Sequence, residues 1–402
     1  MENKVDLFFT KIDTDIEKRI QKDPLSQQVI WTKYASRLYG KVNSITTEIN
    51  GYILTALGLE VIEKYREHNN HITRAKRRNL QVIYEMLVIY ILVEVITEGK
   101  EEFLNDIGFI GKENGKRIYK EKRAQNKEII INRDGNIDER QILISQEYQG
   151  IIARYRTKVK NIGEKKILEV AFKNKKTVEK IEQEFFDIIK KDKPIKYDHC
   201  FRNKEEINVK QEIINSIKNI KANKETWLDL LEITDNDKNG KDLMLKIIME
   251  NEDMSVKQLV GKFLADENLN KDIKEKLEKI QAVENFLVIV NNIFYEIIKN
   301  EKIDLQNKET INELREAHKK VKNEGIYTII SKAIDKSDEE VIKAIIEEHE
   351  RIQKNLNKKA WIEIKDNELV INHKAEKDIN EGWDHNYYID VVRHIAKSFA
   401  KE

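Results

Sequence analysis

The stretch VIYEMLVIYILVEVI (Val82–Ile96) is the most apolar run in the chain, and it decides the fold class. As a helix it would be about 22 Å long, shorter than the roughly 30 Å hydrocarbon core of a bilayer. Glu85 and Glu94 also interrupt it. We therefore predict a buried central helix rather than a membrane span. Thr73 is its expected N-cap residue, and neighbouring helices should wrap around it.

The composition around this run favours long helices. Of the 402 residues, 40% are hydrophobic and 36% are charged, and there are only 2 prolines and 14 glycines. Average usage would give roughly 20 prolines and 28 glycines. Proline breaks helices and glycine weakens them by about 1 kcal/mol, so this scarcity predicts a mainly α protein.

The length exceeds that at which one hydrophobic core usually stops growing, so we predict multi-helix bundle subdomains. The expected segments are a helical unit over 1–100, a basic hairpin and helix over 101–176, a helical bundle over 177–335 and a helix–hairpin–helix over 336–402. The single cysteine, Cys200, excludes an internal disulfide framework and a multi-cysteine zinc site. The first residues lack the long apolar run of a signal peptide, so we expect a cytoplasmic protein.

Helix patterns recur on both sides of the central run. One helix is expected to start at Ser26, and Ser337 with Glu340 fits a capping box near the other end. WIEIKDNELVINH predicts a hairpin, and a final helix follows it. Between 44 and 65, apolar residues at three- and four-residue steps predict a helix with one apolar face. They are Ile45, Ile49, Tyr52, Ile53, Leu57, Val61 and Tyr65.

A longer helix is predicted over 270–300, with apolar residues that alternate steps of four and three. These form a heptad-like seam: Ile273, Leu277, Ile280, Val283, Leu287, Val290, Phe294 and Ile297. Such a seam fits an antiparallel helix of the same chain or a helix of a second subunit. We therefore expect a protein partner, or a homodimer, through this helix.

The segment from 101 to 176 differs in kind. GKENGKRIYKEKRAQNK is predicted as a basic loop, and Asp134-Gly135 between two β-prone runs predicts a hairpin with a type I′ turn. The next helix is expected to be capped by Ser145 and to stop at Gly163.

Positive charge is concentrated in this segment. Between Lys112 and Lys176 there are 18 Lys and Arg against 9 Asp and Glu. Such cations can neutralise phosphates, and the interleaved Tyr119, Tyr148 and Tyr155 offer stacking surfaces for bases. The residues expected to bind nucleic acid are Lys116, Arg117, Lys120, Lys122, Arg123, Arg154, Arg156, Lys158 and Lys160.

A second basic cluster precedes the central helix and consists of Arg74, Lys76, Arg77 and Arg78. The two clusters favour nucleic acid, with DNA first, as the partner. A plain solvated surface, or a face for an acidic protein or membrane, stays open as an alternative reading.

Motifs for metals and nucleotides are incomplete. TDNDKNGKDLML (residues 234–245) resembles half of an EF-hand calcium loop, but Lys246 stands where that family carries a bidentate glutamate. We interpret it as a turn, with Asp242 capping the next helix. Gly111 and Gly115 enclose too few residues for a P-loop.

The sequence contains one candidate for a catalytic motif. Glu363 and Lys365 on a predicted strand match the Asp/Glu-x-Lys pair of divalent-metal nucleases, although no strand-borne acid precedes them nearby. The histidines do not converge. We predict no catalytic residue, metal or cofactor, and expect a non-enzymatic, nucleic-acid-associated component of a prokaryotic assembly for DNA maintenance or phage defence. A metal-dependent nuclease and a purely structural dimerisation protein are the alternatives.

Overall fold

The computed structural model describes residues 23–99, 101–105, 108–132, 150–172, 174–191, 193–201, 208–302, 309–366, 368–373, 383 and 385–399. The chain is 69% helical, with 16 α-helices and two small two-stranded antiparallel sheets in the described part. The prediction of a mainly α protein is therefore confirmed.

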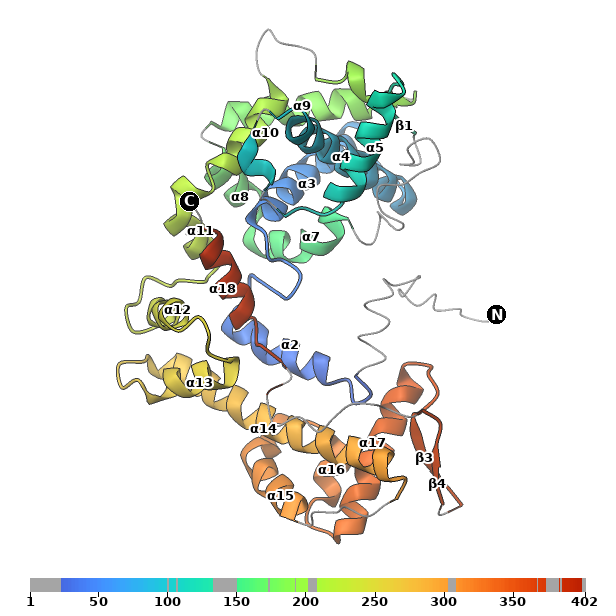
Figure 1. Ribbon diagram of the computed structural model, residues 1–402, viewed down its shortest axis with the longest axis vertical. Helices are drawn as coiled ribbons and strands as arrows, with labels where there is room; N and C mark the ends of the chain where they lie inside the picture. Colours follow the sequence, from blue (N-terminus) through green and yellow to red (C-terminus); the bar gives the residue numbers. More distant parts are fainter. Residues whose placement is uncertain are drawn as a thin grey trace. The chain divides into compact units, whose positions relative to one another are not determined.

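The chain divides into two compact units (Figure 1). Unit 1 comprises Met1–Gly40 and Asp237–Asp390, and unit 2 comprises Lys41–Asn236 and Val391–Glu402. The chain thus leaves unit 1 early and returns to it much later. The finer division into four segments stays a prediction.

Unit 2 is built around α3 (Ile49–His68) and α4 (Arg74–Thr97). The predicted central helix is α4, and its side chains are buried almost without interruption from Leu80 to Ile96. In length and composition α4 is apolar enough to cross a membrane, but 89% of its most apolar window is buried inside the protein. Its apolar run is therefore a core, as the sequence predicted.

Further helices of unit 2 surround this pair. In the described residues, α5 packs on α4, while α7, α8 and α9 pack on α3. Their bounds, with those of the remaining elements, are α5 (Lys112–Ala124), β1 (Ile130–Ile131), α7 (Ile151–Ile162), α8 (Glu164–Ala171), α9 (Lys175–Ile189), β2 (Ile195–Lys196), α10 (Val209–Lys218) and α11 (Lys224–Leu230). β1 and β2 pair antiparallel, with Ile130 opposite Lys196.

Two glycines let aromatic rings lie against the backbone of α3. A Cβ atom at Gly51 would collide with the ring of Tyr155 from α7, and one at Gly58 would collide with the ring of Tyr84 from α4. With both rings packed there, α3 is buried on nearly all sides. The prediction of a single apolar face is therefore wrong. Ile45, assigned to that face, lies before the helix and is exposed.

The two glutamates that interrupt the apolar run join α4 to other elements of unit 2. Glu85 is buried, and its carboxylate accepts a 2.7 Å hydrogen bond from the backbone N–H of Ile152 in the first turn of α7. Glu94 accepts hydrogen bonds from the hydroxyl of Tyr197 and, at 2.6 Å, from the ammonium of Lys210. A carboxylate beside a helix N-terminus or an ammonium is stabilised, so both charges are tolerated inside.

Unit 1 is organised around α14 (Lys271–Asn300), which crosses it diagonally in Figure 1. Helices α2, α13, α15 and α17 pack on it. The remaining bounds are α2 (Gln27–Leu38), α12 (Lys241–Glu250), α13 (Val256–Ala265), α15 (Glu309–Val321), α16 (Thr328–Ala333), α17 (Asp338–Asn355), β3 (Ile362–Lys365) and β4 (Glu368–Ile371). The last helix, α18 (Ile389–Ser398), begins in unit 1 and continues into unit 2.

The heptad-like seam of α14 is buried within the chain. Its eight residues are all at most 4% exposed. The sequence allowed either a helix of the same chain or a helix of a second subunit against this seam. In the structure, helices of the same chain pack on it. A second subunit would have to use another face of α14.

The beginning of the described chain is tied into unit 1 by long-range hydrogen bonds. The side-chain amide of Gln27 donates to the Leu287 carbonyl of α14 at 2.9 Å. The Pro24 carbonyl accepts from Nδ1 of His349 at 2.9 Å, and Nε2 of the same ring accepts from the Trp361 N–H at 2.8 Å. His349 is fully buried and neutral in this arrangement, and burial lowers its pKa to about 4.

Several local predictions are confirmed. Thr73 accepts from the Lys76 N–H and caps α4, and α7 stops at Gly163. Ser337 and Glu340 form the capping box of α17. The hairpin predicted near the end of the chain pairs β3 with β4.

Others are wrong or fall outside the described residues. The predicted basic loop is the helix α5. Asp23, not the side chain of Ser26, accepts from the first N–H groups of α2. Gly240 is the N-cap residue of α12, so Asp242 lies in its first turn and does not cap it. The predicted turn at 134–135 and the predicted cap at 145 lie outside the described residues.

Candidate polyanion-binding surfaces

The predicted cations of the α5 group are Lys116, Arg117, Lys120, Lys122 and Arg123, and they occupy one helix. Carboxylates lie beside several of them. Lys116 is 3.7 Å from Glu113, and Arg117 is 3.0 Å from Glu121. Exposed ion pairs of this kind contribute at most about 1 kcal/mol, so a phosphate can displace them, but they reduce the local excess of positive charge.

Arg123 of this group has a structural role. Its guanidinium lies over the ring of Tyr119 at 4.8 Å and is 2.5 Å from a carboxylate oxygen of Asp198. The other oxygen of Asp198 accepts from the Ile129 N–H at 3.2 Å. Arg123 therefore connects α5 with the turn after β2 and, through Asp198, with the segment before β1, and its charge is already matched.

The cations of the α7 group differ in exposure. Lys160 is exposed, while Arg154 and Arg156 are half-buried. Lys158 is only 9% exposed, and burial together with the charge of Lys41 lowers its pKa. Its ammonium is therefore not presented to solvent as the other cations are.

The tyrosines that were predicted to offer stacking surfaces are not available to bases. Tyr119 and Tyr155 are at most 3% exposed, because their rings pack inside unit 2. Tyr148 lies outside the described residues. The expectation of aromatic stacking at Tyr119 and Tyr155 is therefore wrong.

Arg154 lines a small cavity of about 190 Å³ in unit 2. Glu48 and Tyr155 line the same cavity, and the Tyr155 hydroxyl accepts from the Glu48 N–H at 3.1 Å. Because a carboxylate shares this space, the cavity is a poor site for an anion.

A larger cleft lies where α3 ends and α4 begins. Its volume is about 580 Å³. Seven residues line it: Arg66, Glu67, Asn70, His71, Ile72, Arg74 and Arg77. We call it the arginine cleft. It combines Arg74 and Arg77 of the second basic cluster with Arg66 and His71, which were not among the residues expected to bind nucleic acid.

The turn between the two helices fixes the shape of this cleft. Asn69 donates from its side chain to the Tyr65 carbonyl at 2.7 Å, which closes the end of α3. Asn70 adopts a left-handed conformation with φ of 55°, one that asparagine tolerates better than most residues. Thr73 then caps α4. The positive end of the α4 dipole therefore faces the same space as the arginines.

Two carboxylates accompany the arginines of the cleft. Arg66 pairs with Glu63, and among the described residues Glu67 is the one carboxylate that lines the cleft. The Nε of Arg77 is buried and has no hydrogen-bond partner within the same part of the chain. An unsatisfied buried donor of this kind costs about 1–3 kcal/mol.

One of the predicted α7 residues, which does not line the cleft, lies within electrostatic range of Arg77. Burial and then the positive charge of Arg77 lower the pKa of Arg156. Arg77 of α4 and Arg156 of α7 therefore influence one another electrostatically, although they belong to basic clusters that are separate in the sequence.

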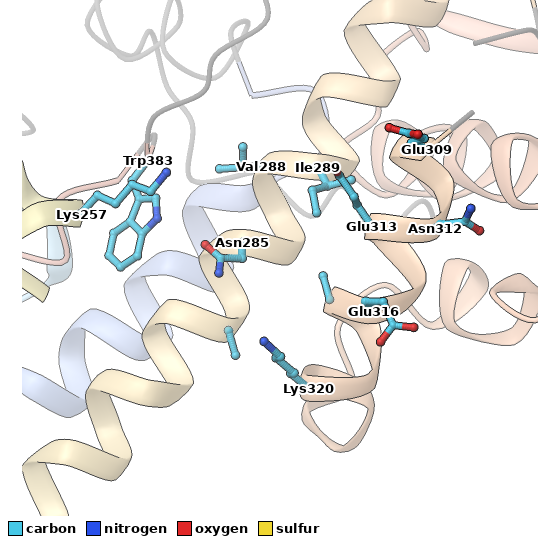
Figure 2. A pocket seen from close by; sticks show the side chains of 12 residues that line it. Lys257, Asn285, Val288, Ile289, Glu309, Asn312, Glu313, Glu316, Lys320 and Trp383 are labelled. Atoms are coloured by element: carbon cyan, nitrogen blue, oxygen red, sulfur yellow. The ribbon is translucent and has the colours of Figure 1, made fainter. Parts of the chain in front are cut away.

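Unit 1 carries a groove of a different character (Figure 2). It has a volume of about 570 Å³ and lies over α14 and α15, with Lys257 and Trp383 on the side away from α15. Glu309, Glu313 and Glu316 follow one another along α15. With these carboxylates at its rim, this groove is the less suitable of the two for a polyanion.

The nuclease candidate lies on the β3–β4 hairpin. Lys365 donates to the Glu363 carboxylate at 2.9 Å, and the Asn372 side chain donates to it at 2.6 Å. These contacts lower the pKa of Glu363. Within the part of the chain that the structure describes, no three His, Cys, Asp or Glu side chains gather as metal ligands. The nuclease activity stays a prediction without further support.

The loop that resembles half an EF-hand forms a turn. Gly240 donates to the Asp237 carbonyl at 2.8 Å, and the Asp237 carboxylate accepts from the side chain of Asn270 at 2.9 Å. Residues 238–240 therefore form a turn, as interpreted, although Asp242 does not cap the next helix.

No protein-family model, curated protein or solved structure matches this chain.

Proposed function

We propose that unit 2 binds nucleic acid, with the arginine cleft as the centre of its binding surface. The observation that carries the proposal is a cleft lined by Arg66 from α3 and by Arg74 and Arg77 from α4, with the positive charge of Arg77 also acting on Arg156 of α7. Guanidinium groups bind phosphate oxygens in pairs, and neutralising phosphates releases counterions.

The helix α5 is a second, weaker group of cations, which lies beside the C-terminal half of α4 and not at the cleft. Lys120 is exposed there, while Arg117 and Lys116 have acidic neighbours on the same helix. A long polyanion can replace those carboxylates as it approaches. We expect α5 to increase the association rate and the salt dependence of binding more than the affinity.

The wider setting that we propose is a non-enzymatic component of a prokaryotic multi-protein assembly in the cytoplasm, concerned with DNA maintenance or phage defence. A protein partner or second copy would meet the open face of α14, because the seam of that helix is filled by the chain itself.

The test is a binding titration of the whole chain with labelled duplex and single-stranded oligonucleotides over a salt series. We expect the affinity to fall steeply as salt rises, and Arg74→Glu with Arg77→Glu to weaken binding by about 100-fold or more. Affinity that is insensitive to both salt and these substitutions would refute the proposal.

A matched control makes the same charge change in unit 1. Lys246 and Lys271 are exposed helix residues, each near one glutamate. The double variant Lys246→Glu, Lys271→Glu should leave binding within about threefold of the wild type, because neither residue belongs to the proposed surface. Circular dichroism melting of both double variants shows whether each remains folded.

A further inference from the structure

We propose that the groove over α14 and α15 binds an amphipathic helix of a protein partner, one whose apolar stripe has lysine or arginine along the flank that faces α15. This inference deepens the part of the proposed function that gives the chain a protein partner, and it rests on that part alone. It follows from the distribution of apolar and polar side chains in the groove and from the charges on α15.

The groove is lined by half-buried apolar side chains and by exposed polar ones (Figure 2). The half-buried apolar residues are Ala282, Val288, Ile289, Ala317 and Trp383. The polar lining residues, which come from α13, α14 and α15, are all exposed. Protein interfaces combine an apolar centre with polar groups that stay accessible to solvent at the rim, and this lining has the same division.

A segment of protein fits this lining better than a small molecule does. Sites for small molecules bury most of the ligand and direct a few polar groups at it from within. Here the polar groups stand at the surface and the apolar groups below them. The volume of about 570 Å³ instead gives room for several apolar side chains of one helix.

The floor of the groove has the spacing of one helix face. Ala282, Asn285 and Ile289 are three and four residues apart on α14, so they lie along one side of it. α15 packs beside that side as one wall, and Trp383 stands on the other. A partner helix in such a groove presents apolar residues at the same three- and four-residue steps.

The charges on α15 select the flank of that helix. Glu309, Glu313 and Glu316 line the groove at steps of four and three residues, on one side of α15. Glu316 pairs with Lys319, but an exposed pair contributes little, and an incoming cation can exchange with it. Glu313 forms no ion pair with any described residue. A cation beside Glu313 therefore gains an attraction that this part of the chain does not already supply.

Two lysines limit where cations of the partner are favoured. Lys320 follows the three glutamates on α15, and Lys257 lies with Trp383 on the side away from α15. Like charges across an interface are unfavourable, so the partner's cations belong beside the glutamates and not beside Lys257. The opposite flank of the bound helix is therefore neutral or acidic.

The test uses two synthetic helical peptides as probes of the whole chain, measured by fluorescence anisotropy. Both carry leucines at three- and four-residue steps and glutamines on one flank. The other flank carries lysines in the first peptide and glutamates in the second. The protein variants are Ala282→Arg and Ile289→Asn, which alter the floor, and Glu313→Lys, which reverses the charge of the wall. The matched control is Glu267→Lys, an exposed residue of unit 1 that does not line the groove.

We expect the lysine peptide to bind the wild type about 10-fold more tightly than the glutamate peptide. Ala282→Arg and Ile289→Asn should each weaken its binding by about 10-fold or more. Glu313→Lys should weaken it by about fivefold and strengthen the binding of the glutamate peptide. Glu267→Lys should change neither. Because Glu313 is exposed, its variant keeps the test decisive even if circular dichroism shows that Ile289→Asn does not fold.

Other outcomes overturn the inference. These are binding of neither peptide, equal binding of both to the wild type, and binding that both floor variants leave unchanged. A wild-type dimer that light scattering shows to be lost in Ala282→Arg also overturns it, because the occupant would then be a second copy. Oligonucleotide binding is measured on the same proteins. Failure of the wild type to bind oligonucleotides overturns the proposed nucleic-acid function and leaves this inference intact.

Discussion

The central helices α4 of unit 2 and α14 of unit 1 differ in how they are surrounded. α4 is buried on all sides over most of its length, whereas α14 buries its seam and leaves residues such as Asn285 exposed. Both nevertheless bury a glutamate. Glu85 of α4 accepts from the Ile152 N–H, and Glu284 of α14 accepts from the Tyr387 hydroxyl at 2.6 Å.

The comparison teaches how an acid in an apolar helix should be interpreted. Each buried carboxylate receives a donor from an element far away in the sequence, 67 residues for Glu85 and 103 for Glu284. In both helices, the buried glutamate forms a hydrogen bond that links its helix to a distant element. This holds for α4, which is buried on all sides, and for α14, which has an exposed face. Its cost of burial is offset only when that donor is in place.

The largest expected effect concerns the seam of α14. Leu287→Ala should lower the free energy of unfolding of unit 1 by about 3 kcal/mol, because Leu287 is fully buried and its removal leaves a cavity. Chemical denaturation measures the change, with Asn285→Ala on the exposed face as a control expected to be nearly neutral. If Leu287→Ala abolished self-association and left the free energy of unfolding unchanged, the seam would be a subunit interface and not part of the core.

Acidification should affect the two units in opposite directions. Burial lowers the pKa of His349 in unit 1 from 6.5 to about 4, so its contribution is full above pH 6.5 and declines by up to about 3 kcal/mol as the pH falls to 4. Burial and then the charge of Glu60 raise the pKa of Glu182 in unit 2 to about 7. Its contribution is full below pH 4.5 and is lost as the pH rises through 7.

Hydrogen exchange checks this difference segment by segment. Between about pH 6.5 and 4.5, amides of α17 should lose protection, after correction for intrinsic rates, while those of α9 should not. His349→Gln should flatten the pH dependence of α17. Parallel loss in both helices would contradict the assignment of these two groups.

The buried glutamates can be compared directly. Glu85→Ala should cost about 2 kcal/mol, because the Ile152 N–H is left without its acceptor in a buried position. Glu284→Ala should cost a similar amount through the Tyr387 hydroxyl. Urea unfolding of both variants is the measurement, and Glu121→Ala on the surface of α5 is the control. A neutral result for either glutamate would show that its connection is dispensable.

The smallest expected effects concern the N-cap residues of the two helices. Thr73 caps α4 by accepting from the Lys76 N–H, and Asn270 caps α14 by accepting from the Asp272 N–H at 2.9 Å. Alanine at either position should cost about 1 kcal/mol in thermal melts. A clearly larger loss at Thr73 would mean that the arginine cleft also depends on this cap.

Local signals allowed much of the fold to be predicted from the sequence. The unbroken apolar run identified α4 as a core helix, and the capping box at Ser337 located the start of α17. These features depend on residues within a few helix turns. The helix α5 was missed because Gly111 and Gly115 indicate a loop, yet Gly115 lies against Ile89 and Val93 of α4. Tertiary packing there outweighs the weak helix propensity of glycine.

The candidate site was predictable only in part, for the same reason. Charge density in the sequence identified Arg77 and Arg156 but not their proximity, which depends on how α7 packs against α3 and α4. It also could not show that Lys158 is buried. The spacing of residues in the sequence shows which of them share a face of one helix. A binding cleft is formed by several helices, so its residues cannot be identified from spacing alone.

The early departure of the chain from unit 1 has a consequence for its synthesis. α2 packs on α14, but more than two hundred residues separate them, and ribosomes add about 5–20 residues per second. The apolar side chains of Trp31, Tyr34 and Leu38 thus wait roughly 10–50 s for their partners. A nascent chain stalled before α14 emerges should leave Trp31 open to a quencher.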